Sequence, residues 1–171
     1  GRMDVLTWKK AMRHAALYIN GGGSLIQNQT STRSLNYYLL SIRLAKLTGN
    51  RVLMYGCGIG PVSGEGCRKS AARVIDRNVD AITLREDLSA EELKTMGVTK
   101  PKVYVTADPA LLLEAGSEGA VDGFLLGNNI DPAGRYALFV LREWQGFEAK
   151  KQAFVQSAKY VKDAYGLTPI F

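Results

Sequence analysis

The chain has 171 residues, of which 46% are hydrophobic, which is enough for one packed domain or for one domain and part of a second. No apolar run approaches the ~20 residues of a membrane-spanning helix and no secretory signal opens the sequence, so we expect a cytoplasmic protein. The net charge of +6 favours an anionic ligand or an anionic membrane face.

Metal and disulfide chemistry are not indicated by the composition. Cys57 and Cys67 are the only cysteines, and His14 is the only histidine. Two cysteines are too few for a disulfide framework, and no Cys/His cluster has the spacing of a zinc site. We expect two reduced thiols and no metal site.

Helical and strand patterns alternate along the chain. Leu35, Leu39 and Ile42 keep helical spacing, and Ser89 with Glu92 predicts a capping box at the start of a later helix. The repeated strand–helix unit predicts an α/β fold, a Rossmann-like parallel sheet with helices on both faces. The expected helices are residues 5–14, 34–48, 65–78, 89–96 and 147–165, and the expected strands are residues 17–20, 51–55, 81–84, 102–105, 136–141 and a last strand from residue 169.

Residues 114–134 differ in character from the rest of the chain. They hold five glycines, an Asn-Asn pair and an Asp-Pro step, and their apolar residues have no clear period. We expect them to be an interdomain linker, with residues 1–113 as the later part of a first Rossmann-like domain and residues 135–171 as the start of a second. The sequence lacks an obvious first strand and stops inside a strand pattern, so we expect a fragment.

Two glycine-rich runs follow apolar strand patterns. They are Asn20-Gly21-Gly22-Gly23-Ser24-Leu25-Ile26-Gln27 and Gly56-Cys57-Gly58-Ile59-Gly60-Pro61. Consecutive glycines cost conformational entropy, so a chain that keeps them usually needs bare backbone there, one reason being a ligand close to the main chain. Loops at the carboxyl ends of adjacent parallel strands line the crevice where open α/β sheets bind ligands. The candidate substrate-binding residues are Gly21, Gly22, Gly23, Ser24, Gln27, Gly58 and Gly60; the alternative is that both loops are plain turns.

These two runs resemble the polysaccharide pyruvyl transferases. The resemblance continues, in the family's order, through Arg85-Glu86-Asp87-Leu88-Ser89, Thr106-Ala107-Asp108-Pro109-Ala110 and Val140-Leu141-Arg142. The family often has Gln where this chain has Cys57. The sequence is most similar to members that pyruvylate a cell-wall polymer to which surface-layer proteins anchor. The resemblance implies two Rossmann-like domains facing a cleft, as in the glycosyltransferase-B architecture.

The implied reaction moves the pyruvyl group of phosphoenolpyruvate to two hydroxyls of one sugar, forming a ketal and releasing phosphate. The implied partners are phosphoenolpyruvate and a lipid-linked oligosaccharide acceptor, with a peripheral contact at the inner membrane face as a further option and no nucleic acid. No cofactor is expected, because phosphoenolpyruvate is itself the donor substrate. A general acid must protonate the methylene carbon. The resemblance puts that residue beyond Phe171 and not at His14, so we expect this chain alone to be inactive.

Arg85 and Arg142 are the candidate catalytic residues. Each follows a predicted strand, and arginine matches both the carboxylate and the phosphate of the donor bidentately. The resemblance makes both donor-binding candidates that approach one cleft. Asp87 or Glu86 is expected to orient Arg85, and Asp87 is a further substrate-site candidate. The alternatives are a surface ion pair for Arg142 and a charge cluster at a helix start for Arg85 and Asp87. Asp108-Pro109 is interpreted as a turn.

Other interpretations stay open at this point. Tyr37, Tyr38 and Trp144 could stack on a sugar, but core packing or a domain contact is favoured. A nucleotide-sugar glycosyltransferase of the same architecture is an alternative function, and it needs a nucleotide-binding carboxylate or arginine in the second domain. A non-catalytic anion- or nucleic-acid-binding module is a third, supported only by the charge and the glycine loops.

Overall fold

The computed structural model describes residues 5–143 and 146–171. Two compact units make up the chain, Gly1–Leu113 and Glu114–Phe171. Within the described residues, no helix is long and apolar enough to cross a membrane. Trp144 lies outside the described residues.

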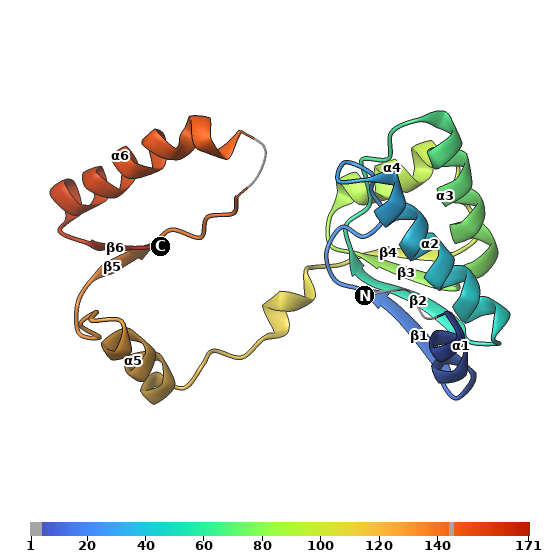
Figure 1. The fold of residues 1–171 in the computed structure, drawn as a ribbon, viewed down its shortest axis with the longest axis horizontal. Helices are drawn as coiled ribbons and strands as arrows, with labels where there is room; N and C mark the ends of the chain where they lie inside the picture. Colours follow the sequence, from blue (N-terminus) through green and yellow to red (C-terminus); the bar gives the residue numbers. More distant parts are fainter. Residues whose placement is uncertain (1–4, 144–145) are drawn as a thin grey trace. The chain divides into compact units, whose positions relative to one another are not determined.

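The first unit is built on a parallel sheet. Its strands are β1 (Leu17–Gly21), β2 (Arg51–Cys57), β3 (Ala81–Leu84) and β4 (Lys102–Val105), and they lie side by side in chain order (Figure 1). β-branched and aliphatic residues in these short runs suit strands that pack against helices. The predicted α/β class with a Rossmann-like parallel sheet is therefore confirmed.

Three crossover helices connect these strands: α2 (Thr32–Leu47), α3 (Glu65–Asn78) and α4 (Asp87–Met96). α2 packs beside α3, and α3 beside α4 (Figure 1). Parallel connections are right-handed, and the strand order does not reverse across this sheet, so all three helices cover the same face. The expectation of helices on both faces is wrong for the described part of the chain, because only a reversal of strand order sends a crossover to the other side.

The core of the first unit lies between the sheet and these helices. Every second residue of β2 and β3 points into this core, and four of these residues are at most 1% exposed: Val52, Met54, Ile82 and Leu84. Each such side chain contributes ~1.5–3 kcal/mol when it leaves water completely. The intervening side chains point to the other face, where Ile19 is 55% exposed. α1 (Val5–Arg13) contacts α2.

The start of α4 differs from the predicted capping box. The helix begins at Asp87 with Glu86 as its N-cap, so Ser89 lies inside the first turn. The buried Ser89 hydroxyl accepts a hydrogen bond from the Ile59 N–H at 2.7 Å and donates one to Glu86 Oε1 at 2.7 Å. The capping-box prediction is wrong because the buried Ile59 N–H takes the Ser89 hydroxyl as its acceptor.

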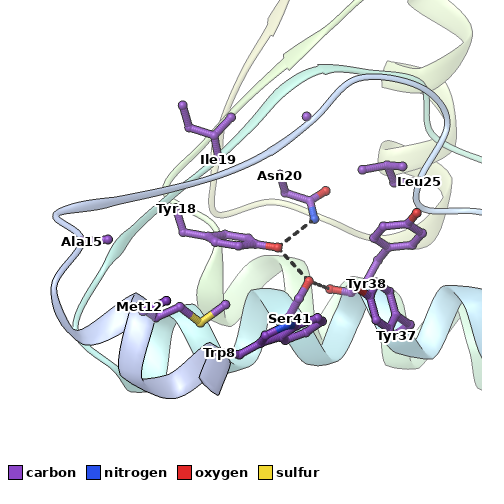
Figure 2. Close-up of a pocket in the computed structure, with 12 residues that line it drawn as sticks. Trp8, Met12, Ala15, Tyr18, Ile19, Asn20, Leu25, Tyr37, Tyr38 and Ser41 are labelled. Carbon is purple, nitrogen blue, oxygen red and sulfur yellow. Dashed lines mark hydrogen bonds between the residues drawn. The ribbon is translucent and has the colours of Figure 1, made fainter. Parts of the chain in front are cut away.

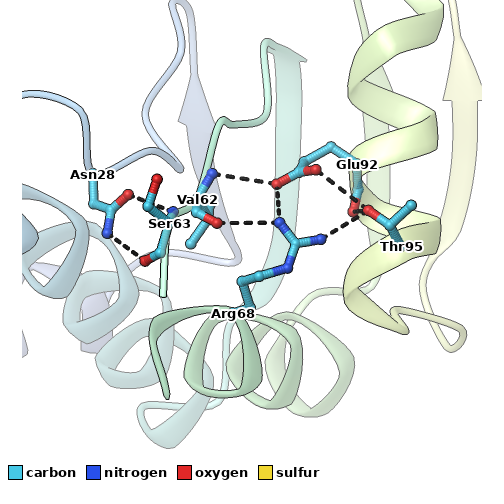
Figure 3. Close-up of polar contacts among 6 residues, drawn as sticks. All are labelled: Asn28, Val62, Ser63, Arg68, Glu92 and Thr95. Carbon is cyan, nitrogen blue, oxygen red and sulfur yellow. Dashed lines mark hydrogen bonds and ion pairs between the residues drawn. The ribbon is translucent and has the colours of Figure 1, made fainter. Parts of the chain in front are cut away.

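Glu92, the other residue of that prediction, fixes the loop between β2 and α3 (Figure 3). Its Oε1 atom lies 2.6 Å from Arg68 Nη1 and accepts from the Val62 N–H at 3.2 Å. Asn28 and Ser63 exchange two further hydrogen bonds of 2.8 Å each. These contacts hold the glycine-rich loop after β2 against its neighbours.

The second unit contains one strand–helix–strand motif. β5 (Tyr136–Leu138) and β6 (Thr168–Ile170) pair in parallel and are joined by α6 (Phe147–Tyr165). The strand expected over residues 136–141 therefore ends at Leu138. The neighbouring helix α5 (Glu118–Gly127) lies within residues 114–134, where the sequence indicated no period. Glycine is unfavourable in helix interiors, so the glycines of this stretch argued against a helix in the sequence.

Candidate functional site

The two glycine-rich loops lie next to each other at the carboxyl edge of the first unit's sheet. The Gly22 N–H donates to the Tyr55 carbonyl at 3.1 Å, and the Gly58 N–H donates to the Gly23 carbonyl at 3.1 Å. Gly22 and Gly23 have φ angles of 73° and 65°, in the left-handed region that glycine adopts at little cost. A Cβ atom placed on either glycine would have no neighbouring atom within 4 Å. Their backbone is therefore bare and open to a ligand.

Arg85 links the first of these loops to the ends of β3 and β4. Its Nη2 atom donates to Ser24 Oγ at 3.1 Å, and its Nη1 atom lies 3.1 Å from Asp108 Oδ2. Its Nε atom lies 3.4 Å from Glu86 Oε2. A Cβ at Gly58 would stand 2.5 Å from Ser24 Oγ, so a side chain at this position would displace the Ser24 hydroxyl from its place beside Arg85.

The Arg85 cluster is charged and accessible. The Arg85 side chain is 27% exposed, and a guanidinium has five N–H donors, of which the hydrogen bonds to Ser24 and Asp108 use two. The Ala110 N–H and the Arg85 guanidinium lower the pKa of Asp108, which keeps that carboxylate ionised. One guanidinium therefore lies between two carboxylates, and its remaining donors can bind an anion or a hydroxyl oxygen.

Cys57 is close to this edge but is unsuited to nucleophilic chemistry. Burial raises the pKa of its thiol to about 11, and its Sγ atom donates to the Asn20 carbonyl at 3.2 Å. The thiolate is the reactive form of cysteine, and at neutral pH it is scarcely populated here. No group of three or more metal-ligating side chains occurs in the described part of the chain.

The structure brings some of the candidate residues together and separates others. Ser24 and Arg85 are in contact over Gly58, and Gly21, Gly22 and Gly23 precede Ser24 on the same loop. By contrast, Gln27 bonds to Thr30, with 3.0 Å between Gln27 Nε2 and Thr30 Oγ1. Gly60 faces the side chain of Glu92, 2.8 Å from the place of a Gly60 Cβ.

Asp87 takes no part in these contacts, and Arg142 belongs to the other unit. Asp87 is the exposed first residue of α4, where its charge favours the helix dipole, and Arg85 instead pairs with Glu86 and Asp108. Arg142 belongs to the second unit. It is exposed and lies four residues beyond the end of β5.

Glu86 and Asp108 are the site residues that sequence reasoning underrated. Asp108 caps the short helix η1 (Pro109–Leu112) through the Ala110 N–H at 3.0 Å, as a turn residue does, and it also pairs with Arg85. The signal was available, because an acidic residue follows each of two neighbouring parallel strands, whose carboxyl ends meet at one edge.

Comparison with known proteins gives a family match. The family model for polysaccharide pyruvyl transferases matches residues 3–167. No curated protein and no solved structure gives a significant match.

Proposed function

Because the chain belongs to the polysaccharide pyruvyl transferase family, we propose that it serves the transfer of the pyruvyl group of phosphoenolpyruvate to a sugar. The product is a cyclic ketal on a cell-wall polysaccharide precursor, and phosphate is released. The proposed acceptor is lipid-linked and is used in the cytoplasm at the inner membrane face. The modified polymer would then anchor surface-layer proteins.

The observation that carries the proposal is the setting of Arg85. Its guanidinium is held by Ser24, Glu86 and Asp108 at the sheet edge beside two open glycines. Donors that are already oriented can bind a carboxylate or phosphate oxygen without ordering a flexible side chain.

The proposed roles follow from the charges of the cluster. Arg85 holds one anionic group of the donor, and Arg142 is proposed as the second donor-binding arginine. Glu86 and Asp108 are acceptor-only when ionised, so either can take the proton of the attacking sugar hydroxyl. The general acid that protonates the methylene carbon has no assigned residue.

Steady-state kinetics of the complete protein test the role of Arg85. A charge-assisted hydrogen bond is worth about 1.5–3 kcal/mol, so Arg85→Ala should lower kcat/KM for phosphoenolpyruvate roughly tenfold to hundredfold. Arg85→Lys should recover only part of this loss, because lysine keeps the charge without the fork. Arg73→Ala on the exposed side of α3 is the matched control for losing one arginine. Unchanged kcat/KM in Arg85→Ala would remove Arg85 from the donor site.

Thermal unfolding with added ligands separates the alternative functions. A ligand at 100 times its Kd stabilises the native state by about 2.7 kcal/mol. Phosphoenolpyruvate should raise the midpoint, whereas uridine diphosphate and single-stranded RNA should leave it unchanged. A rise with uridine diphosphate alone would favour a nucleotide-sugar glycosyltransferase, and a rise with RNA alone a nucleic-acid-binding module.

A further inference from the structure

A cavity of about 460 Å³ lies between α1, β1 and α2 in the first unit (Figure 2). Its walls carry Trp8 from α1, Tyr18 from β1, and Tyr37 and Tyr38 from α2. Among the described residues, the lining holds no lysine, arginine, aspartate or glutamate. The aromatic and uncharged polar side chains described there suit an uncharged ligand better than the anionic donor proposed for Arg85.

The aromatic rings that line the cavity pack edge to face on one another. Trp8 and Tyr37 meet edge to face with centroids 5.2 Å apart, and Tyr37 and Tyr38 do the same at 5.2 Å. In neither pair does one ring stack flat on the other. Ring faces of Trp and Tyr combine apolar contact area with a polar end, which suits the C–H face of a pyranose ring. Tyr38 packs against the core cluster, as the interpretation favoured from the sequence holds, and it also lines this cavity.

A polar chain crosses the same cavity wall (Figure 2). Asn20 Nδ2 donates to the Tyr18 hydroxyl at 3.4 Å, which donates to Ser41 Oγ at 2.8 Å. Asn20 is 3% exposed, and its Oδ1 atom has no hydrogen-bond partner among the described residues. A buried acceptor without a donor is costly. A ligand that brings a hydroxyl or amide donor would remove this cost.

The cavity and the Arg85 cluster share one loop. Gly21 and Leu25 both line the cavity, and between them Ser24 accepts the hydrogen bond from Arg85. An extended ligand seated in the cavity therefore lies against the loop that contacts the proposed donor site.

We propose that this cavity binds a sugar ring of the acceptor saccharide, adjacent to the ring that receives the pyruvyl group. This inference rests on the proposed function. Aromatic faces pack on the sugar's C–H surface, and its hydroxyls pair with Asn20 Oδ1 and the Tyr18–Ser41 hydroxyls. An alkyl or prenyl chain would fill the volume but leave Asn20 Oδ1 without a donor.

Direct saccharide binding to the full chain tests the proposal without any turnover. Trp144→Phe leaves Trp8 as the sole tryptophan, and its emission is followed during titration with methyl glycosides of glucose, galactose, mannose and N-acetylglucosamine. We expect at least one glycoside to change the emission saturably, with a Kd in the millimolar range. In this background, Asn20→Leu and Tyr37→Ala should each weaken that binding at least tenfold, while Tyr37→Phe should retain it. Asn36→Leu, at an exposed position of α2 outside the cavity, is the control.

The outcomes separate the proposal from its rivals. Circular dichroism checks the fold of each variant, and Ser41→Ala replaces Asn20→Leu if the latter does not fold. No binding by any glycoside, equal binding by wild type and both weakened variants, or a response to n-octanol alone would each overturn the sugar site. Sugar binding by the complete protein without turnover of phosphoenolpyruvate would overturn the proposed function and leave the sugar site standing. Turnover by Asn20→Leu with an unchanged KM for the saccharide would overturn the sugar site and leave the proposed function standing.

Discussion

The two units of the chain differ in how far their sheets are covered. In the first, three crossover helices pack on four strands and bury a continuous core. In the second, one crossover helix joins two strands, and Leu125 and Ala158 are the buried hydrophobic residues among those described. A single strand–helix–strand unit has too little surface to enclose many side chains.

This difference bears on how well each unit can position a catalytic group. Arg85 follows a strand whose side chains Ile82 and Leu84 are fully buried, so its backbone is fixed by packing on one face and by ladder hydrogen bonds on both sides. Arg142 follows a strand whose Leu138 is 66% exposed. Groups on rigid elements are held more accurately than groups on loops. We therefore expect the first unit to supply the accurately placed part of the site.

Matched leucine truncations should give the largest contrast between the units. Leu84→Ala opens a cavity in a filled core and should lower the free energy of unfolding by about 2–5 kcal/mol. Leu138→Ala removes an exposed side chain and should change it by only about 0.5 kcal/mol. Urea denaturation of both variants measures this. An equal loss in the two variants would mean that Leu138 is covered in solution and would break the comparison.

Two glycine substitutions should give an intermediate contrast. Gly56 has a φ of 58°, and a Cβ there would collide with the ring of Pro109. Gly56→Ala should therefore cost the ~1–2 kcal/mol of a left-handed alanine and a further ~1–3 kcal/mol for the overlap.

Gly166, which ends α6, is the matched position in the second unit. Its φ is 64°, but no atom lies within 4 Å of a Cβ there, so Gly166→Ala should cost only the ~1–2 kcal/mol of the backbone conformation. Thermal unfolding compares the two. A milder effect of Gly56→Ala than of Gly166→Ala would show that the Pro109 contact yields easily.

Protonation of Glu92 in the first unit should give the smallest of these effects. Partial burial opposes ionisation of Glu92, but the hydrogen bonds from Arg68 and the Val62 N–H outweigh it and lower its pKa below the ordinary 4.5. A lowered pKa in the folded state stabilises the protein above about pH 4.5, and this is lost as the pH falls through the lowered value. Glu92→Gln should therefore flatten the dependence of stability on pH in that range, as urea midpoints between pH 3 and 7 would measure.

The exposed pair of the second unit supplies the control. Lys151 and Glu148 lie 3.6 Å apart with side chains 62% and 77% exposed, and such pairs contribute about 0–1 kcal/mol. Lys151→Ala should leave the free energy of unfolding nearly unchanged, and this small difference from the wild type should not depend on salt. If Lys151→Ala proved as costly as Glu92→Gln, the pairs would not differ in the way their burial indicates.

The sequence alone determined the class of fold and the order of its elements. Apolar periodicity is a local property, and residues 65–78, 81–84 and 102–105 form the predicted helix and strands without change. The five ordered motifs likewise identified the family. Helix α5 was missed because glycines at Gly119 and Gly123 obscured its period.

Only the tertiary structure decided which side chains meet. The sequence offered Asp87 and Glu86 as equal partners for Arg85, and the fold selected Glu86 and the more distant Asp108. In the fold, Ser89 also accepts a hydrogen bond from Ile59, and Glu92 pairs with Arg68. A cavity lies beside Tyr37 and Tyr38. Apart from the Glu86 pair, these contacts join residues that are far apart in the chain. Their geometry depends on strand order and helix packing, which local periodicity does not encode.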